Sequence, residues 1–135
     1  MSPCLCTMLR RATRAVTTAY DAAMAPAGLR VTQFSVLGTL ARLGPLPVTR
    51  LAREVGLDRS TMGRDLDPLE RRGLVLIEVG EKDRRERVAR LTAAGKAAIE
   101  AARPYWSIAQ ERIAGLVRAD TVRSLAAQLD ALRGP

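Results

Sequence analysis

Arginine is the side chain on which most of the possible chemistry in this sequence depends. Of its 22 basic residues only Lys82 and Lys96 are lysine, so the other positive charges are guanidinium groups. A guanidinium offers a planar fork of donors that suits phosphate oxygens and base edges. Three of these groups, Arg84, Arg85 and Arg87, crowd one short charged segment. The composition favours a phosphate-bearing partner, although genomic base composition produces the same enrichment.

Two cysteines, Cys4 and Cys6, lie near the start of a predicted helix. Helix N-termini stabilise thiolates, so both are candidates for a redox sensor. At positions i and i+2 they point about 200° apart around a helix, which disfavours a disulfide within the turn. A bridge to a partner subunit stays open. The alternative is that they make small apolar contacts, and a lone Cys-x-Cys is too sparse for a metal site.

The absence of histidine argues against enzymatic and zinc chemistry. Histidine is the commonest general base and zinc ligand, and the sequence has none. No nucleophile is paired with a base, so we expect neither an enzyme nor a bound metal or cofactor. No aliphatic stretch is long enough to cross a bilayer, and no signal peptide is recognisable. We expect a cytoplasmic protein with reduced cysteines.

The length of 135 residues suits a single domain, and apolar spacing predicts mostly helix at both ends. A first helix is expected over residues 3–24, with Ser2 as N-cap and Pro3 at its first position. A second runs from about Thr32, a possible N-cap, to Leu43, where Gly44-Pro45 ends it.

The middle of the chain has the pattern of a helix-turn-helix. Residues 46–57 predict a short helix closed by Gly56, and Asp58 caps a second helix over residues 59–72 that ends at Gly73. The aliphatic runs 74–79 and 87–91 flank a charged turn and predict a two-stranded β-hairpin. Thr92 then caps a helix over residues 93–117, which Pro104 should kink or divide.

The terminal helices leave apolar stripes without a partner. A last helix is expected over residues 119–132. A chain of this size cannot cover both stripes, so we expect a homodimer built on the terminal helices. The stripes consist of Leu5, Leu9, Val16, Leu125, Leu129 and Leu132.

Four segments resemble the MarR family of winged helix-turn-helix transcriptional regulators: 31–34, 51–61, 69–75 and especially 83–95. The last, Asp-Arg-Arg-Glu-Arg-Val-Ala-Arg-Leu-Thr-Ala-Ala-Gly, is similar to the family's Asp-x-Arg wing followed by Leu-Thr-x-x-Gly. The resemblance implies a mainly α (α+β) fold in one domain, residues 1–135. A DNA-binding lobe would cover about residues 30–92, and the dimerisation helices about 1–27 and 93–135.

The helix that begins at residue 59 is the predicted reader of the DNA major groove. Ser60, Thr61 and Arg64 lie within one turn and can hydrogen-bond base edges, while Arg59 and the helix N-terminus can bind phosphate. The alternative is purely structural: Asp58 and Ser60 cap the helix, and Arg64 pairs with Asp65 or Asp67.

The arginines of the hairpin tip are suited to a narrow minor groove, whose negative potential attracts inserted guanidinium groups. By the resemblance, Arg85 is the inserted side chain and Asp83 orients it. The alternative for Arg84, Arg85 and Arg87 is a solvated charged turn. Residues 50–90 carry a net charge of only +2, from 11 basic and 9 acidic residues. The prediction of DNA binding therefore rests on the positions of the arginines and not on the net charge of these residues.

The resemblance also places an effector pocket between the terminal helices and the central lobe, where Tyr20 and Trp106 are candidate lining residues; the alternative is that both are core aromatics. We expect a dimeric regulator, most often a repressor, that binds a pseudo-palindromic double-stranded operator and is released by a small molecule or thiol oxidation. The competing hypothesis is a non-specific architectural DNA-binding protein.

Overall fold

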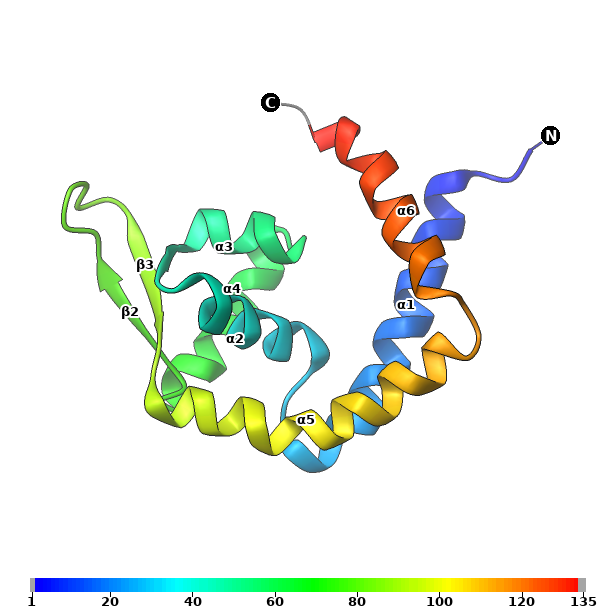
Figure 1. The fold of residues 1–135 in the computed structure, drawn as a ribbon. Coiled ribbons are helices and arrows are strands. Elements are labelled where there is room, and N and C mark those ends of the chain that lie inside the picture. The colour runs from blue at the N-terminus through cyan, green and yellow to red at the C-terminus, as the bar shows by residue number, and fades with distance from the viewer. Residues whose placement is uncertain (1, 134–135) are drawn as a thin grey trace.

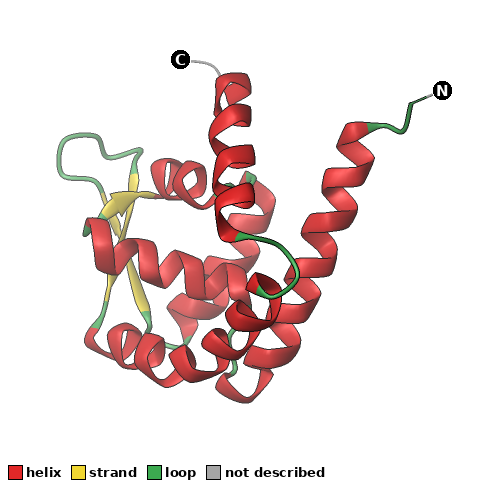
Figure 2. Ribbon diagram, turned by 45° about the vertical axis from the view of Figure 1, so that its right-hand side comes forward, coloured by secondary structure: helices red, strands yellow, loops and turns green. Residues whose placement is uncertain are grey.

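Two long helices, α1 (Leu5–Met24) and α5 (Ala93–Ala114), pack against each other and support the rest of the chain. The structure is a computed structural model that describes residues 2–133. In Figure 1, α5 runs along the base of the molecule, from the helix-turn-helix lobe to the terminal helices α1 and α6 (Ala119–Leu129), which we call the arm. Figure 2 shows that α6 stands apart from α1. Met1, Gly134 and Pro135, at the ends of the predicted domain, lie outside the described residues.

The first helix begins later than expected. Its N-cap is Cys4, so the prediction of Ser2 as cap and Pro3 as first residue is wrong by two residues. A 3₁₀ turn, Ala25–Ala27, follows it and ends at Gly28, which has a positive φ of 70°. The second helix, α2 (Val31–Leu43), begins ahead of Thr32: its N-cap is Arg30, whose backbone N–H donates to Gln33 Oε1 at 3.0 Å.

The predicted helix-turn-helix is present, with one additional strand. The short helix is α3 (Val48–Val55), and Asp58 caps α4 (Arg59–Arg71), which continues through Pro68. Residues 46 and 47 were expected in the short helix but form strand β1, which pairs with β3. Pro45 and Pro47 disfavour helix there, and Leu46, 4% exposed, is buried opposite Ala89 of β3.

The predicted hairpin consists of β2 (Val75–Val79) and β3 (Arg87–Leu91). They pair antiparallel, with Val75 opposite Leu91 and Val79 opposite Arg87. Together with β1 they form a three-stranded sheet in the order β1-β3-β2. Figure 2 shows the hairpin at the side of the helical lobe, with its tip reaching beyond the helices.

Pro104 does not divide α5, which is continuous from Ala93 to Ala114. The proline removes one backbone donor, but Ala102 and Ala109 on either side stay buried, so packing holds the helix together. The helix ends three residues before the expected Val117. The last helix, α6 (Ala119–Leu129), is likewise shorter than expected and passes into a 3₁₀ turn, Asp130–Arg133.

The hydrophobic core lies in the central lobe and under α5. Thr92 caps α5 by accepting a hydrogen bond from the Gly95 N–H at 3.0 Å, and its hydroxyl donates to the Gly73 carbonyl at 2.6 Å. This ties the start of α5 to the end of α4. Over residues 2–133, no helix is long and apolar enough to span a membrane. The largest fully buried apolar residues are Met24, Val36, Leu37, Leu40, Leu51, Met62, Leu69 and Val75.

Candidate nucleic-acid interface

The start of α4 is fixed by its N-cap. Asp58 Oδ1 accepts a hydrogen bond from the Thr61 backbone N–H at 2.8 Å. That amide, followed by the Thr61 hydroxyl and the more distant charge of Arg64, lowers the pKa of Asp58 below its usual value. The carboxylate therefore stays ionised at the positive end of the helix. Arg59, Ser60 and Arg64 are exposed on the first two turns, and Thr61 is half-buried.

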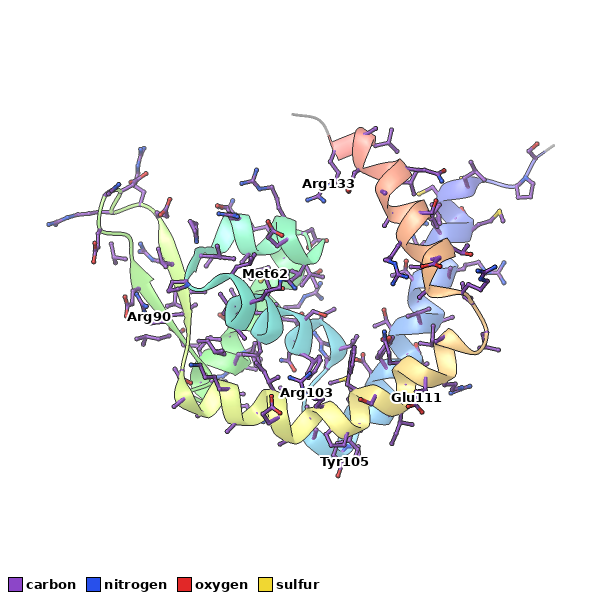
Figure 3. The ribbon with its side chains drawn as sticks, viewed as in Figure 1. Met62, Arg90, Arg103, Tyr105, Glu111 and Arg133 are labelled. Carbon is purple, nitrogen blue, oxygen red and sulfur yellow. The ribbon has the colours of Figure 1, made fainter. Side chains whose placement is uncertain are left out.

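The turn between α3 and α4 presents this helix end to solvent. Gly56 adopts a left-handed conformation, with φ of 69°, and the Leu57 N–H donates to the Ala52 carbonyl at 2.9 Å. Leu51 of α3 and Met62 of α4 are both buried, so the two helices share one apolar contact region. Figure 3 labels Met62 between them. The inner faces of both helices are used for packing, which leaves the polar start of α4 free.

The tip of the β2–β3 hairpin, which we call the wing, is held by its own backbone. Gly80 N–H donates to the Glu86 carbonyl at 2.9 Å, and a Cβ at Gly80 would lie 2.7 Å from the Asp83 carbonyl oxygen. Asp83 Oδ1 accepts from the Arg85 N–H at 3.0 Å and lies 3.4 Å from Arg85 Nε. The Arg85 side chain is 94% exposed. Asp83 thus contacts Arg85 while the guanidinium group projects into solvent.

The other two wing arginines differ in their contacts. Arg87 Nη1 donates to the Arg84 carbonyl at 3.1 Å, so its guanidinium folds back along the loop. Arg84 is exposed at the tip. The wing therefore presents Arg84 and Arg85 outward, whereas Arg87 also braces the turn.

A groove of about 570 Å³ lies between α3, α4 and the wing. It brings Arg59 of α4 and Arg85 of the wing to one depression, although 26 residues separate them. Its floor is apolar and its rim is rich in arginine. Thr49 and Arg53 of α3 also line it; sequence reasoning missed them, although their i, i+4 spacing places them on one helix face. The full lining is Val48, Thr49, Ala52, Arg53, Arg59, Met62, Gly63, Arg85, Glu86 and Arg87.

The alternative in which the polar residues of α4 serve only as helix caps and ion pairs is correct in part. Asp58 does cap the helix. Asp65, however, is fully buried and pairs with Arg30, so it is not a partner of Arg64. Within residues 2–133, no ion pair is formed between Arg64 and any carboxylate, Asp67 included. Arg64 is therefore available to an external partner.

The cysteines lie at the start of α1 and do not line this groove. Both are exposed. The Thr7 backbone amide and hydroxyl lower the pKa of Cys4, although its sulfur makes no capping hydrogen bond of normal geometry. Arg10 Nη2 lies 3.5 Å from Cys6 Sγ. Within the described residues no cluster of three or more potential metal ligands occurs.

Tyr20 and Trp106 lie where α1, α2 and α5 meet. The Trp106 ring stacks on Phe34, with centroids 5.6 Å apart and an interplanar angle of 25°. The Tyr20 hydroxyl donates to Gln110 Oε1, and burial raises the pKa of Tyr20. Both residues are half-buried against the core. They join the arm to the central lobe, and their assignment to an effector pocket remains a prediction.

Comparison with known proteins identifies the fold family. The MarR family model matches residues 29–86. The M. tuberculosis transcriptional regulator MosR is 35% identical, with 98% of this chain and 96% of MosR covered and a TM-score of 0.84. No curated protein matches the sequence significantly. The chain belongs to the MarR family.

Two MarR-fold relatives are known with DNA. MosR in complex with DNA is 34% identical to this chain, over 97% of both chains, with a TM-score of 0.83. The transcriptional repressor CouR, bound to a 23-mer DNA duplex, is 29% identical over 97% of this chain and 93% of its own, with a TM-score of 0.75. CouR from Rhodococcus jostii RHA1 is also known bound to p-coumaroyl-CoA. The MarR model matches α2, α3, α4 and the wing as far as Glu86.

Proposed function

We propose that this MarR-family chain is a sequence-specific regulator of transcription that binds a pseudo-palindromic double-stranded operator as a homodimer. In this mode of binding α4 enters the major groove, where Ser60, Thr61 and Arg64 read base edges and Arg59 contacts phosphate. The wing enters the adjacent minor groove with Arg85, which Asp83 orients, and Arg84 and Arg87 contact the backbone.

The observation that carries the proposal is the single groove that joins the start of α4 to the wing. Arg59 and Arg85 line the same depression, and the exposed Arg64 has no ion-pair partner within residues 2–133. In duplex DNA, one sugar-phosphate strand separates the major groove from the adjacent minor groove. A protein that reads both grooves therefore needs a depression between its two reading elements that receives this strand. The DNA complexes of MosR and CouR support it by similarity.

A homodimer is supported by the exposed apolar residues of the arm. On α1, Leu5 is 73% exposed, and on α6, Val122 is 51% and Leu125 is 42% exposed. Large apolar side chains that stay exposed on two helices are typical of surfaces that a partner covers. Dimerisation would place two α4 helices at the spacing that two half-sites require.

Release of DNA would follow a change at the arm. Tyr20 and Trp106 would line a small-molecule site at the junction of α1, α2 and α5, and CouR, which binds p-coumaroyl-CoA, is a relative with such a ligand. Alternatively, oxidation of Cys4 or Cys6 would act there. Both thiols are exposed, and the lowered pKa of Cys4 increases its thiolate fraction. Either change would shift the dimer between two spacings of α4.

We further propose that the protein acts in the cytoplasm as a regulator and not as an enzyme, and that it requires no cofactor. The competing function is a non-specific architectural DNA-binding protein. One observation favours it: the excess charge is spread over the chain, with a net charge of +4 on residues 1–49 against +2 on residues 50–90. An architectural protein would bind all duplexes alike, with an affinity set by salt.

A gel-shift assay on the duplex upstream of its own gene tests the proposal. We expect a discrete complex that a scrambled duplex does not form at equal concentration. The assay is then repeated with reductant, peroxide and a panel of aromatic acids, and in parallel with Cys4→Ser and Cys6→Ser. Peroxide release that a serine variant abolishes identifies the thiol sensor. Equal affinity for DNA in reductant and in peroxide contradicts the thiol-sensor hypothesis and leaves the small-molecule site as the proposed cause of release.

A further inference from the structure

Asp65 is a charged side chain buried completely within the lobe, on the helix proposed to read DNA. Its exposed fraction is 0%, and it lies next to Arg64, which is exposed. Oδ2 of Asp65 is also buried and accepts no hydrogen bond from any residue between 2 and 133. A buried carboxylate that keeps an unsatisfied oxygen costs free energy, so stability alone does not explain an aspartate at this position.

The other oxygen of Asp65 is bound from the start of α2. Arg30 Nη2 lies 2.6 Å from Asp65 Oδ1, and this hydrogen bond, reinforced by the charge of Asp65, raises the pKa of Arg30. Gln33 makes a second tie, because its Nε2 donates to the Asp65 carbonyl at 3.4 Å while its Oε1 accepts from the Arg30 N–H. The middle of α4 is thus held through both the side chain and the backbone of one residue.

The same segment is tied to the arm and to the end of α4. Asp21 Oδ1 of α1 accepts from the Val31 N–H at 2.8 Å, directly beside Arg30. At the other end, Arg72 Nη1 donates to the Gly28 carbonyl at 2.7 Å. Residues 28–33, which comprise the loop before α2 and its first turn, therefore connect α1 with α4 by polar contacts on both sides.

We propose that Arg30 and Asp65 are a positioning pair that sets the rotation of α4 about its axis, and thereby the direction in which Arg64 meets the bases. Consecutive helical residues point about 100° apart, so an inward anchor at Asp65 fixes the outward direction of its neighbour. The Arg30–Asp65 and Gln33–Asp65 hydrogen bonds are directional, and two of them to the same residue restrict its orientation in a way that an apolar contact does not. This inference rests on the proposed DNA-binding function.

The test compares the ratio of dissociation constants for scrambled and operator DNA among folded variants. Asp65→Ala removes the tie, and Asp65→Asn keeps an oxygen acceptor of the same shape but loses the charge. Glu100→Ala is the control, because it breaks an Arg103–Glu100 ion pair of 3.0 Å that lies on the exposed side of α5. Figure 3 labels Arg103 on α5, away from the wing. Circular dichroism and thermal unfolding establish that each variant is folded.

We expect Asp65→Ala to lower the discrimination ratio at least about fivefold, the effect of misplacing one side chain that reads a base, and Asp65→Asn to fall between it and the wild type. The Glu100→Ala ratio should equal the wild-type ratio. A folded Asp65→Ala with wild-type discrimination overturns the inference. If Asp65→Ala does not fold, the Asp65→Asn ratio decides in the same way. If the wild-type protein binds operator and scrambled DNA equally, the proposed function is refuted, and the inference is refuted with it.

Discussion

At the scale of single residues, Arg64 belongs to the α4 part of the interface and Arg85 to the wing part. Removing the two side chains should change DNA binding in different ways. Arg64 projects from the capped start of α4 without an ion-pair partner in residues 2–133, and Arg85 from the wing with 94% of its side chain exposed. Arg64 is positioned to contact base edges in the major groove. Arg85 is positioned to enter the minor groove, whose attraction for a guanidinium group depends on the width of the groove.

Arg64→Ala should reduce operator affinity by about 1–3 kcal/mol, and chiefly at particular positions of the operator. The reason is that, without the guanidinium group, the protein no longer distinguishes the bases at the position that Arg64 reads. The measurement is fluorescence anisotropy on a set of single-base operator substitutions. An equal reduction on every sequence would make Arg64 a phosphate clamp, and base reading would then pass to Ser60 and Thr61.

Arg85→Ala should weaken operator binding and reduce the slope of log K against log salt by about 0.9, the effect of leaving one phosphate without its neutralising charge. Base preferences in the major-groove half-site should survive. Arg112→Ala, which removes an equal charge from α5, is the matched control and should leave the slope intact. An unchanged affinity and slope for Arg85→Ala would mean that the wing tip is only a solvated turn.

At the scale of elements, the Thr92 cap and Gly95 hold the start of α5 against the base of the β2–β3 hairpin. A Cβ at Gly95 would collide with the Leu74 carbonyl oxygen and the Leu91 side chain. This close approach gives a physical reason for the glycine in the Leu-Thr-x-x-Gly segment. It also means that the helix and the base of the sheet cannot separate without disrupting their packing.

Gly95→Ala should therefore lower the free energy of unfolding by about 1–3 kcal/mol, the usual cost of overpacking. Gly38→Ala is the control, because outside the neighbouring backbone of α2 no atom lies within 4 Å of its added Cβ, and α2 should gain slightly from alanine. Urea unfolding followed by circular dichroism measures both. If Gly95→Ala were as stable as Gly38→Ala, the packing between α5 and the sheet would be loose.

Elements with strong local signals were predicted well from the sequence. The Asp58 cap, the Gly56 turn and the hairpin all depend on neighbouring residues, and all are present. The strand β1 was missed because two residues have no periodicity of their own; it exists only through pairing with β3. Of the two outcomes expected at Pro104, a kink or a division of α5, the division was wrong, because local propensity ignores the packing of flanking alanines.

The same distinction between local signals and long-range contacts applies to the candidate DNA-binding site. The exposed arginines at the start of α4 and on the wing follow from local patterns. The groove that joins them, with Thr49 and Arg53, depends on how three elements meet. The Arg30–Asp65 pair spans 35 positions, and the sequence offered Asp65 only as a possible partner of Arg64. Contacts between distant residues carry no signal in a single sequence.

At the scale of the whole molecule, the exposed apolar residues of α1 and α6 should form an obligate dimer interface with a second copy. Leu125→Glu places a charge in the apolar stripe of α6 and should shift the protein toward monomer, with loss of operator binding. Ala127→Glu adds the same charge on the opposite side of α6 and should remain dimeric. Sedimentation velocity at micromolar concentration measures both. A wild type that is a folded, monodisperse monomer would refute the interface.

The central claim is that the chain distinguishes its operator from other DNA. The most direct measurement is the dissociation constant for the upstream operator and for a scrambled duplex of equal length, each over a series of salt concentrations. We predict operator binding tighter by about 10³-fold or more at physiological salt, with both affinities falling as salt rises. Equal affinities for the two duplexes at every salt concentration would contradict it and establish a non-specific architectural protein.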